Sequence, residues 1–86
     1  MAKKAEAYKA KLTQTLEMLK KTCPSEAAAI TNLENKLAEL NKEIVALKQA
    51  TKERNGGQIK AVNAQIKATV KETNAILRSL QGKCQL

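Results

Sequence analysis

The sequence predicts an all-α fold, an up-down-up antiparallel three-helix bundle with coiled-coil-like packing. Strong helix formers such as Ala, Leu, Lys, Glu and Gln dominate the 86 residues. Apolar residues recur at spacings of three and four, and two short breaks separate three such segments. The breaks hold the only Pro, Pro24, and the pair Gly56-Gly57. Because a chain of this length builds one small core, residues 1–86 are expected to form a single domain.

The first helix is expected over residues 2–21. One side of it is apolar, at Ala5, Tyr8, Leu12, Leu16 and Leu19. The break that follows places Pro24 at the first position of the next helix, where its missing N–H is tolerated. Cys23 is then expected as the N-cap, with the Glu26 side chain reaching back to the backbone N–H of the cap residue.

The second helix, over residues 24–55, carries the longest apolar seam. Its members are spaced three and four residues apart, as in coiled coils: Ile30, Leu33, Leu37, Leu40, Ile44 and Leu47. Gly56 and Gly57 are expected to end this helix, because Gly readily adopts the positive φ of a tight reversal.

The third helix is expected over residues 58–81, with Gly82 just past its end. Its seam repeats the same spacing, at Ile59, Val62, Ile66, Thr69, Thr73, Ile76 and Leu80. Two interpretations of the seam threonines are open. Their hydroxyls either bond the carbonyl four residues earlier or lie at the edge of the stripe. Alternatively, they form a small polar layer or cavity that fixes the helix register or receives the Tyr8 hydroxyl.

The second helix is longer than the first, at about 1.5 Å per residue. The first helix should therefore stop near the level of Ile44 and Leu47. Beyond it, the other two helices are expected to extend as a hairpin with part of the Ile44–Ile66 seam uncovered, which favours self-association. This end is the candidate interaction surface, made of Leu47, Lys48, Thr51, Lys52, Arg54, Ile59, Lys60 and Val62.

The two cysteines are expected at the same pole, because Cys23 ends the first helix and Cys84 follows the third. An intrachain disulfide needs Cα atoms about 5.5 Å apart, and this topology allows that approach. Free thiols and an intermolecular bridge are the alternatives. A disulfide would imply an oxidising or extracellular setting. Because no membrane-spanning run and no N-terminal signal are visible, the chain is expected to be soluble.

The residues needed for catalysis are missing. The chain has no His and no Asp, so a Cys nucleophile would lack its usual partner and two Cys cannot complete a zinc site. Gly56-Gly57 is not followed by the Lys and Ser or Thr of a phosphate-binding loop. We therefore expect no enzyme activity, no metal, no cofactor and no small-molecule substrate.

The net charge of +8 is concentrated in the first and third helices, while the second is neutral. Such an excess attracts polyanions, so nucleic acid and anionic lipid are possible partners. Nucleic-acid binding is disfavoured because Arg is scarce and no recognised motif is present. A protein partner or self-association is the preferred expectation.

Two segments resemble leucine-zipper and designed coiled-coil repeats of the forms L-E-x-K-[VL]-x-E-L and K-E-I-x-A-L-K. They are Leu33-Glu34-Asn35-Lys36-Leu37-Ala38-Glu39-Leu40 and Lys42-Glu43-Ile44-Val45-Ala46-Leu47-Lys48. The resemblance implies helix packing and specifies no activity, and no basic DNA-reading region precedes the repeats. A natural and an artificial or engineered bundle both fit it. The expected function is that of a non-catalytic structural or protein-interaction scaffold.

Overall fold

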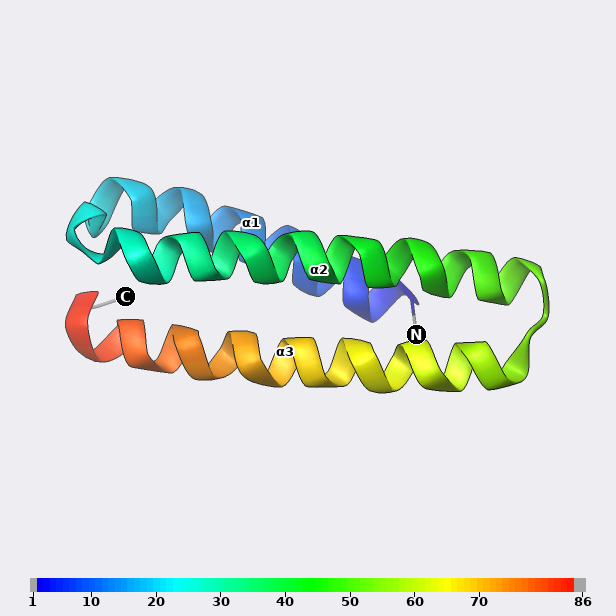
Figure 1. Cartoon of the computed structure of the whole chain (residues 1–86). Helices are drawn as coiled ribbons and strands as arrows, with labels where there is room; N and C mark the ends of the chain where they lie inside the picture. Colours follow the sequence, from blue (N-terminus) through cyan, green and yellow to red (C-terminus); the bar gives the residue numbers. More distant parts are fainter. Residues whose placement is uncertain (1, 85–86) are drawn as a thin grey trace.

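The computed structural model describes residues 2–84 and contains three helices joined by short turns. α1 spans Ala2–Thr22, a 3-10 turn η1 spans Pro24–Glu26, α2 spans Ala27–Lys52 and α3 spans Gly56–Cys84. The helices run up, down and up along one axis (Figure 1), in a rod about 44 Å long and 17 Å across. No strand occurs within residues 2–84. The predicted all-α three-helix fold is confirmed.

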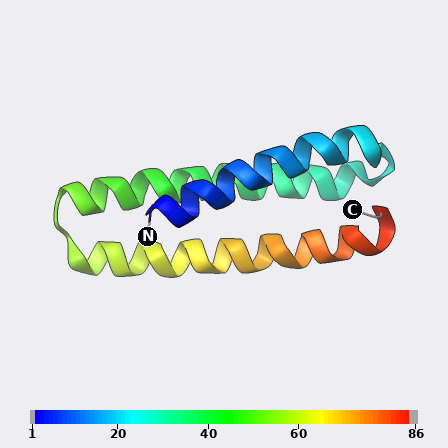
Figure 2. The ribbon, with the colours of Figure 1, turned by 180° about the vertical axis from the view of Figure 1, so that it is seen from behind.

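α2 is the central helix, because it packs against both α1 and α3, whereas α1 and α3 approach each other at few points. Toward the disulfide end, a pole cluster joins all three helices through Leu12, Leu16, Leu19, Cys23, Ile30, Leu33 and Leu80. Farther along lies a middle cluster of Ala5, Leu40, Ile44, Leu47, Val62 and Ile66. The rear view in Figure 2 shows that the N-terminal end of α1 stops well short of the α2–α3 turn. The core therefore uses the predicted apolar seams.

The α2–α3 turn differs from the prediction. Gly56 and Gly57 do not end α2 with positive φ; the residue with positive φ is Arg54, at 57°. Its N–H donates to the Thr51 carbonyl at 3.1 Å, and the Asn55 N–H donates to the Ala50 carbonyl at 3.0 Å. These two bonds form a Schellman motif, which satisfies the free carbonyls at the end of α2.

Asn55 and the glycines instead begin α3. The Asn55 side-chain oxygen accepts a hydrogen bond from the Gln58 N–H at 3.1 Å, which is N-capping geometry. With this cap in place, Gly56 is the first residue of α3. The Asn-Gly-Gly sequence therefore begins α3, and the prediction that the glycines end α2 is wrong.

The turn at the other pole also differs in detail. The Cys23 side chain makes no capping hydrogen bond, and a 3-10 turn precedes α2. The Cys23 sulfur is instead bonded to Cys84, with the two Cα atoms 5.9 Å apart. α3 continues through Gly82 to Cys84 rather than ending near residue 81. This extension brings Cys84 level with Cys23, so the intrachain disulfide joins the two predicted cysteines.

The seam threonines follow both predicted behaviours in part. Thr73 is fully buried and its hydroxyl donates to the Thr69 carbonyl at 2.7 Å, as the local interpretation predicts. The Thr69 hydroxyl instead donates across the helix interface to Oε2 of Glu43 at 3.0 Å. The other oxygen of Glu43 is buried and has no hydrogen-bond partner within the described residues. The Tyr8 hydroxyl does not join these threonines.

Valine substitution should separate the two threonines. Thr73→Val is expected to change the free energy of unfolding by less than about 1 kcal/mol, because it removes a local bond and keeps the side-chain shape. Thr69→Val should lower it by about 1–3 kcal/mol, because the half-buried Glu43 carboxylate loses its hydrogen bond. Urea denaturation of both variants measures the difference. A larger loss for Thr73→Val than for Thr69→Val would contradict these assignments.

Candidate functional site

The sequence-predicted surface lies on the α2–α3 hairpin end, beyond the start of α1 (Figure 1). Its exposed members are polar: Lys48, Thr51, Lys52, Arg54 and Lys60. Leu47 and Val62 are only 2% and 1% exposed, and Ile59 is half-buried. The expectation of an uncovered Ile44–Ile66 seam is wrong, because α2 and α3 close against each other there. The side chains of Leu47 and Val62 are therefore covered within the chain.

One cation of this surface is paired within the chain. Lys48 on α2 forms an ion pair with Glu6 on α1. The hydrogen bond and the positive charge of Lys48 hold the pKa of the exposed Glu6 carboxyl below its ordinary value. Lys52, Arg54 and Lys60 form no ion pair with any described residue. Whether the hairpin end binds a partner stays a prediction.

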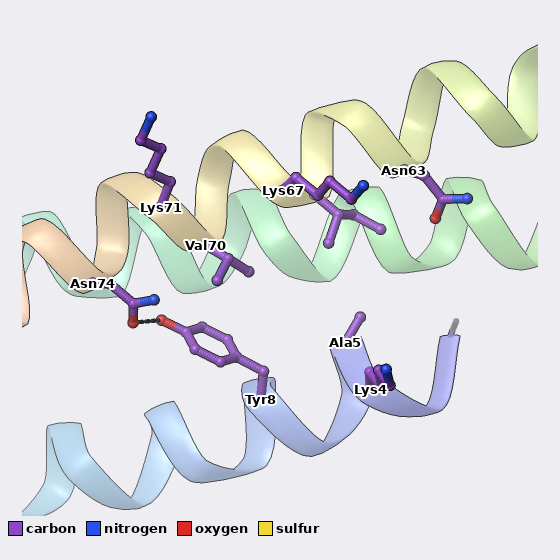
Figure 3. A pocket seen from close by; sticks show the side chains of 9 residues that line it. Lys4, Ala5, Tyr8, Asn63, Lys67, Val70, Lys71 and Asn74 are labelled. Carbon is purple, nitrogen blue, oxygen red and sulfur yellow. Dashed lines mark hydrogen bonds between the residues drawn. The ribbon is translucent and has the colours of Figure 1, made fainter.

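A different surface is hollowed between α1 and α3 (Figure 3). The larger of two hollows has a volume of about 480 Å³ and an apolar lining of Ala5, Tyr8, Ile66 and Val70. Its polar lining is Lys4, Asn63, Lys67, Lys71 and Asn74. A second hollow of about 200 Å³ shares Tyr8 and Asn74 and is otherwise lined by Lys11, Leu12, Thr15 and Leu77. We call the two together the α1/α3 groove.

Tyr8 bridges the groove. Its hydroxyl donates to Oδ1 of Asn74 at 2.7 Å, and its ring faces Val70 (Figure 3). Partial burial of the ring raises the pKa of the Tyr8 phenol, because burial disfavours the charged phenolate. This is a direct polar link from α1 to α3, in a region where the two helices otherwise touch little.

The raised pKa predicts a loss of stability in base. Since the folded-state pKa of Tyr8 lies above the unfolded value, the contribution is intact below the unfolded value of about 10 and is lost as pH rises through the folded value. Tyr8 is the only tyrosine, so the absorbance of tyrosinate reports one group. Its titration midpoint should be higher in the native protein than in urea. Equal midpoints would contradict the assignment.

The groove is positively charged without compensation. No described acidic residue lines it. Four lysines do: Lys4, Lys11, Lys67 and Lys71. None of these lysines forms an ion pair within residues 2–84. The other helix interfaces differ, since Lys20 pairs with Glu34 between α1 and α2. Among the described residues, the α1/α3 groove therefore carries four unpaired lysines and no acidic residue, although unpaired cations such as Lys52 and Lys60 also lie at the hairpin end.

The acidic residues lie toward the other interfaces. Lys36 on α2 pairs with Glu72 on α3 and lies 3.6 Å from Glu39. The hydrogen bond to Glu72 raises the pKa of Lys36 above its ordinary value. Among the described residues, no group of three or more His, Cys, Asp and Glu is arranged to hold a metal ion. No described helix has the length and apolar character needed to cross a membrane.

The groove is not evident from the sequence. Val70, which lies outside the α3 seam, contributes to its floor, and Leu77 lines the second hollow. The available signal is the apolar stripe of α3, which is wider than packing against α2 requires. Its meaning depends on how far α1 stands from α3, and seam spacing does not report that distance.

Comparison with known proteins found no relative. No family model matches the chain, no curated protein matches it, and no solved structure matches it.

Proposed function

We propose that this protein is a non-catalytic interaction module, a crosslinked three-helix bundle that binds a protein partner. The observation that carries the proposal is the α1/α3 groove, where Tyr8, Ile66 and Val70 line a hollow of about 480 Å³. Apolar grooves between helices are common docking sites for a helix of another protein. The Cys23–Cys84 bond supports a role in an oxidising setting, where it would keep α3 attached at the pole.

Affinity capture with the oxidised protein tests the proposal. Val70→Glu places a charge in the groove, and Val45→Glu is a matched control because Val45 is 60% exposed on α2. The same protein should be captured by the wild type and by Val45→Glu and lost with Val70→Glu, with or without nuclease. Circular dichroism checks that both variants fold. Capture that disappears with nuclease, or survives Val70→Glu, would contradict the proposal.

The alternative is a basic module that binds nucleic acid or an anionic membrane surface. It is favoured by the net charge of +8 and by the unpaired lysines of the groove. Contacts of lysine with phosphate are not sequence-specific and weaken steeply with salt. Gel shift and co-sedimentation with phosphatidylserine vesicles at physiological salt test it directly. Tight binding in either assay, without a captured protein, would favour the alternative.

A further inference from the structure

We infer that the α1/α3 groove binds an acidic amphipathic helix of a partner protein, which lies along α1 and α3 as a fourth helix of the bundle. The inference rests on the proposed function and specifies the chemistry of the partner. Three features of the groove support it: the spacing of its lining residues, its division into two hollows, and its charge.

The lining residues repeat at helical spacing. On α1, one row of lining residues steps by four, three and four, at Lys4, Tyr8, Lys11 and Thr15, with Ala5 and Leu12 beside it. On α3, one row steps by four, three, four and three, at Asn63, Lys67, Val70, Asn74 and Leu77, with Ile66 and Lys71 beside it. The facing rows of α1 and α3 form a seam. The partner helix can lie along this seam with its own side chains at matching intervals of three and four residues. From Asn63 to Leu77 the seam is about 21 Å long, or about four helical turns.

The shape favours a helix over a lipid chain. The Tyr8–Asn74 hydrogen bond separates the two hollows, which share only these two residues. Successive apolar side chains of a helix fit separate hollows one after another, as knobs fit holes. An unbranched acyl chain needs one continuous channel, and the bridge interrupts it.

The charge favours an acidic partner. Lys67 and Lys71 are four residues apart on α3, and Lys4 lies on the α1 side (Figure 3). Glutamates four residues apart on the bound helix would lie beside these lysines, like the flanking charges that select coiled-coil partners. Such charges increase the association rate and exclude basic helices. A second copy of this chain is disfavoured, because its net charge of +8 would repel the groove.

Synthetic peptides test the inference with the intact, oxidised protein. The probe is a helical peptide of about eighteen residues, with Leu at core positions and Glu at flanking positions. The control peptide carries Lys in place of each Glu. The acidic peptide should bind and shift the backbone amide resonances of Tyr8, Val70 and Asn74 in the ¹⁵N-labelled protein. The basic peptide should not bind.

Two charge-reversal variants locate the site. Lys67→Glu/Lys71→Glu should weaken binding of the acidic peptide about tenfold or more, because repulsion replaces attraction at the groove. Lys52→Glu/Lys60→Glu makes the same change in net charge at the hairpin end and should alter affinity by no more than about twofold. An equal loss in both variants would show attraction by net charge alone and would overturn the inference.

The remaining outcomes separate this inference from the proposed function. A captured protein partner that is lost with Val70→Glu but is not an acidic helix would overturn the inference and leave the interaction module standing. Amide shifts confined to the hairpin end would overturn both. Phosphatidylserine vesicles that bind through Lys67 and Lys71 when the acidic peptide does not would overturn both. A concentration-dependent dimer that protects Tyr8 and Val70 would replace the acidic helix with a second copy.

Discussion

Removing the disulfide should lower the free energy of unfolding by about 4 kcal/mol and the melting temperature by about 20 °C. The bond joins Cys23 and Cys84 across a sequence separation of 61. A loop of this length restricts the unfolded chain strongly, and the chain-entropy model assigns most of the stabilisation to that restriction. The effect is large for a core with no Phe and no Trp.

The measurement is urea and thermal denaturation of Cys23→Ser/Cys84→Ser beside the oxidised wild type. Cys23 is buried in the pole cluster, so the Ser substitution also changes packing. Reduction of the wild type corrects for this, because it breaks the crosslink and keeps both sulfur atoms. Reduction should reproduce most of the loss and should leave the Ser variant unchanged. A loss below about 1 kcal/mol on reduction would contradict the chain-entropy account.

Leu40→Ala should be comparably severe, with a loss of about 3–4 kcal/mol. Leu40 is fully buried in the middle cluster, together with Ala5 of α1 and Val62 of α3. Truncation removes apolar contacts with both neighbouring helices and leaves a cavity that straight helices cannot easily close.

Met18→Ala is the matched control, because Met18 is 54% exposed on α1 and has a side chain close in size to that of Leu. Its loss should stay within about 0.5 kcal/mol. Chemical denaturation of both variants in the oxidised form measures the difference. Similar losses at the two positions would mean that the middle cluster does not support the bundle as the burial indicates.

Seam spacing predicted the core because one physical rule decides it: a helix must bury its apolar stripe. Leu33, Leu40 and Leu80, each in a predicted seam, are buried in the core of the bundle. The lengths of the helices likewise predict that the N-terminal end of α1 lies near the level of Ile44 and Leu47. Ala5, near that end, lies in the cluster that contains both residues.

The turn between α2 and α3 was not predictable from Gly preferences alone. Arg54 adopts the left-handed conformation, which ordinarily favours Gly, because the bonds of Arg54 and Asn55 to the end of α2 outweigh its cost. Asn55 then caps α3, which leaves Gly56 and Gly57 inside the next helix. Competition between two helix ends for the same residues decided the boundary.

The candidate site was the least predictable part. The helix lengths predict an uncovered seam at the hairpin end, yet Leu47 and Val62 are buried there in the middle cluster. The groove exists because α1 packs mainly against α2 and contacts α3 little. It also depends on the hydrogen bond from Tyr8 to Asn74, which is 66 residues away in the sequence. No local pattern encodes such a pairing, because it follows from the packing of whole helices.

The disulfide also divides the chain into a ring and an arm. Residues 23–84, with α2 and α3, close into a covalent ring through the Cys23–Cys84 bond. α1 lies outside this ring and is joined to it covalently at one end, where Thr22 precedes Cys23. The rest of α1 is held by packing and by side-chain contacts such as Glu6 with Lys48. α1 can therefore detach while the ring stays closed, which makes it the first unit expected to open. One wall of the groove is thus anchored covalently, and the other is free to adjust its distance to an incoming helix.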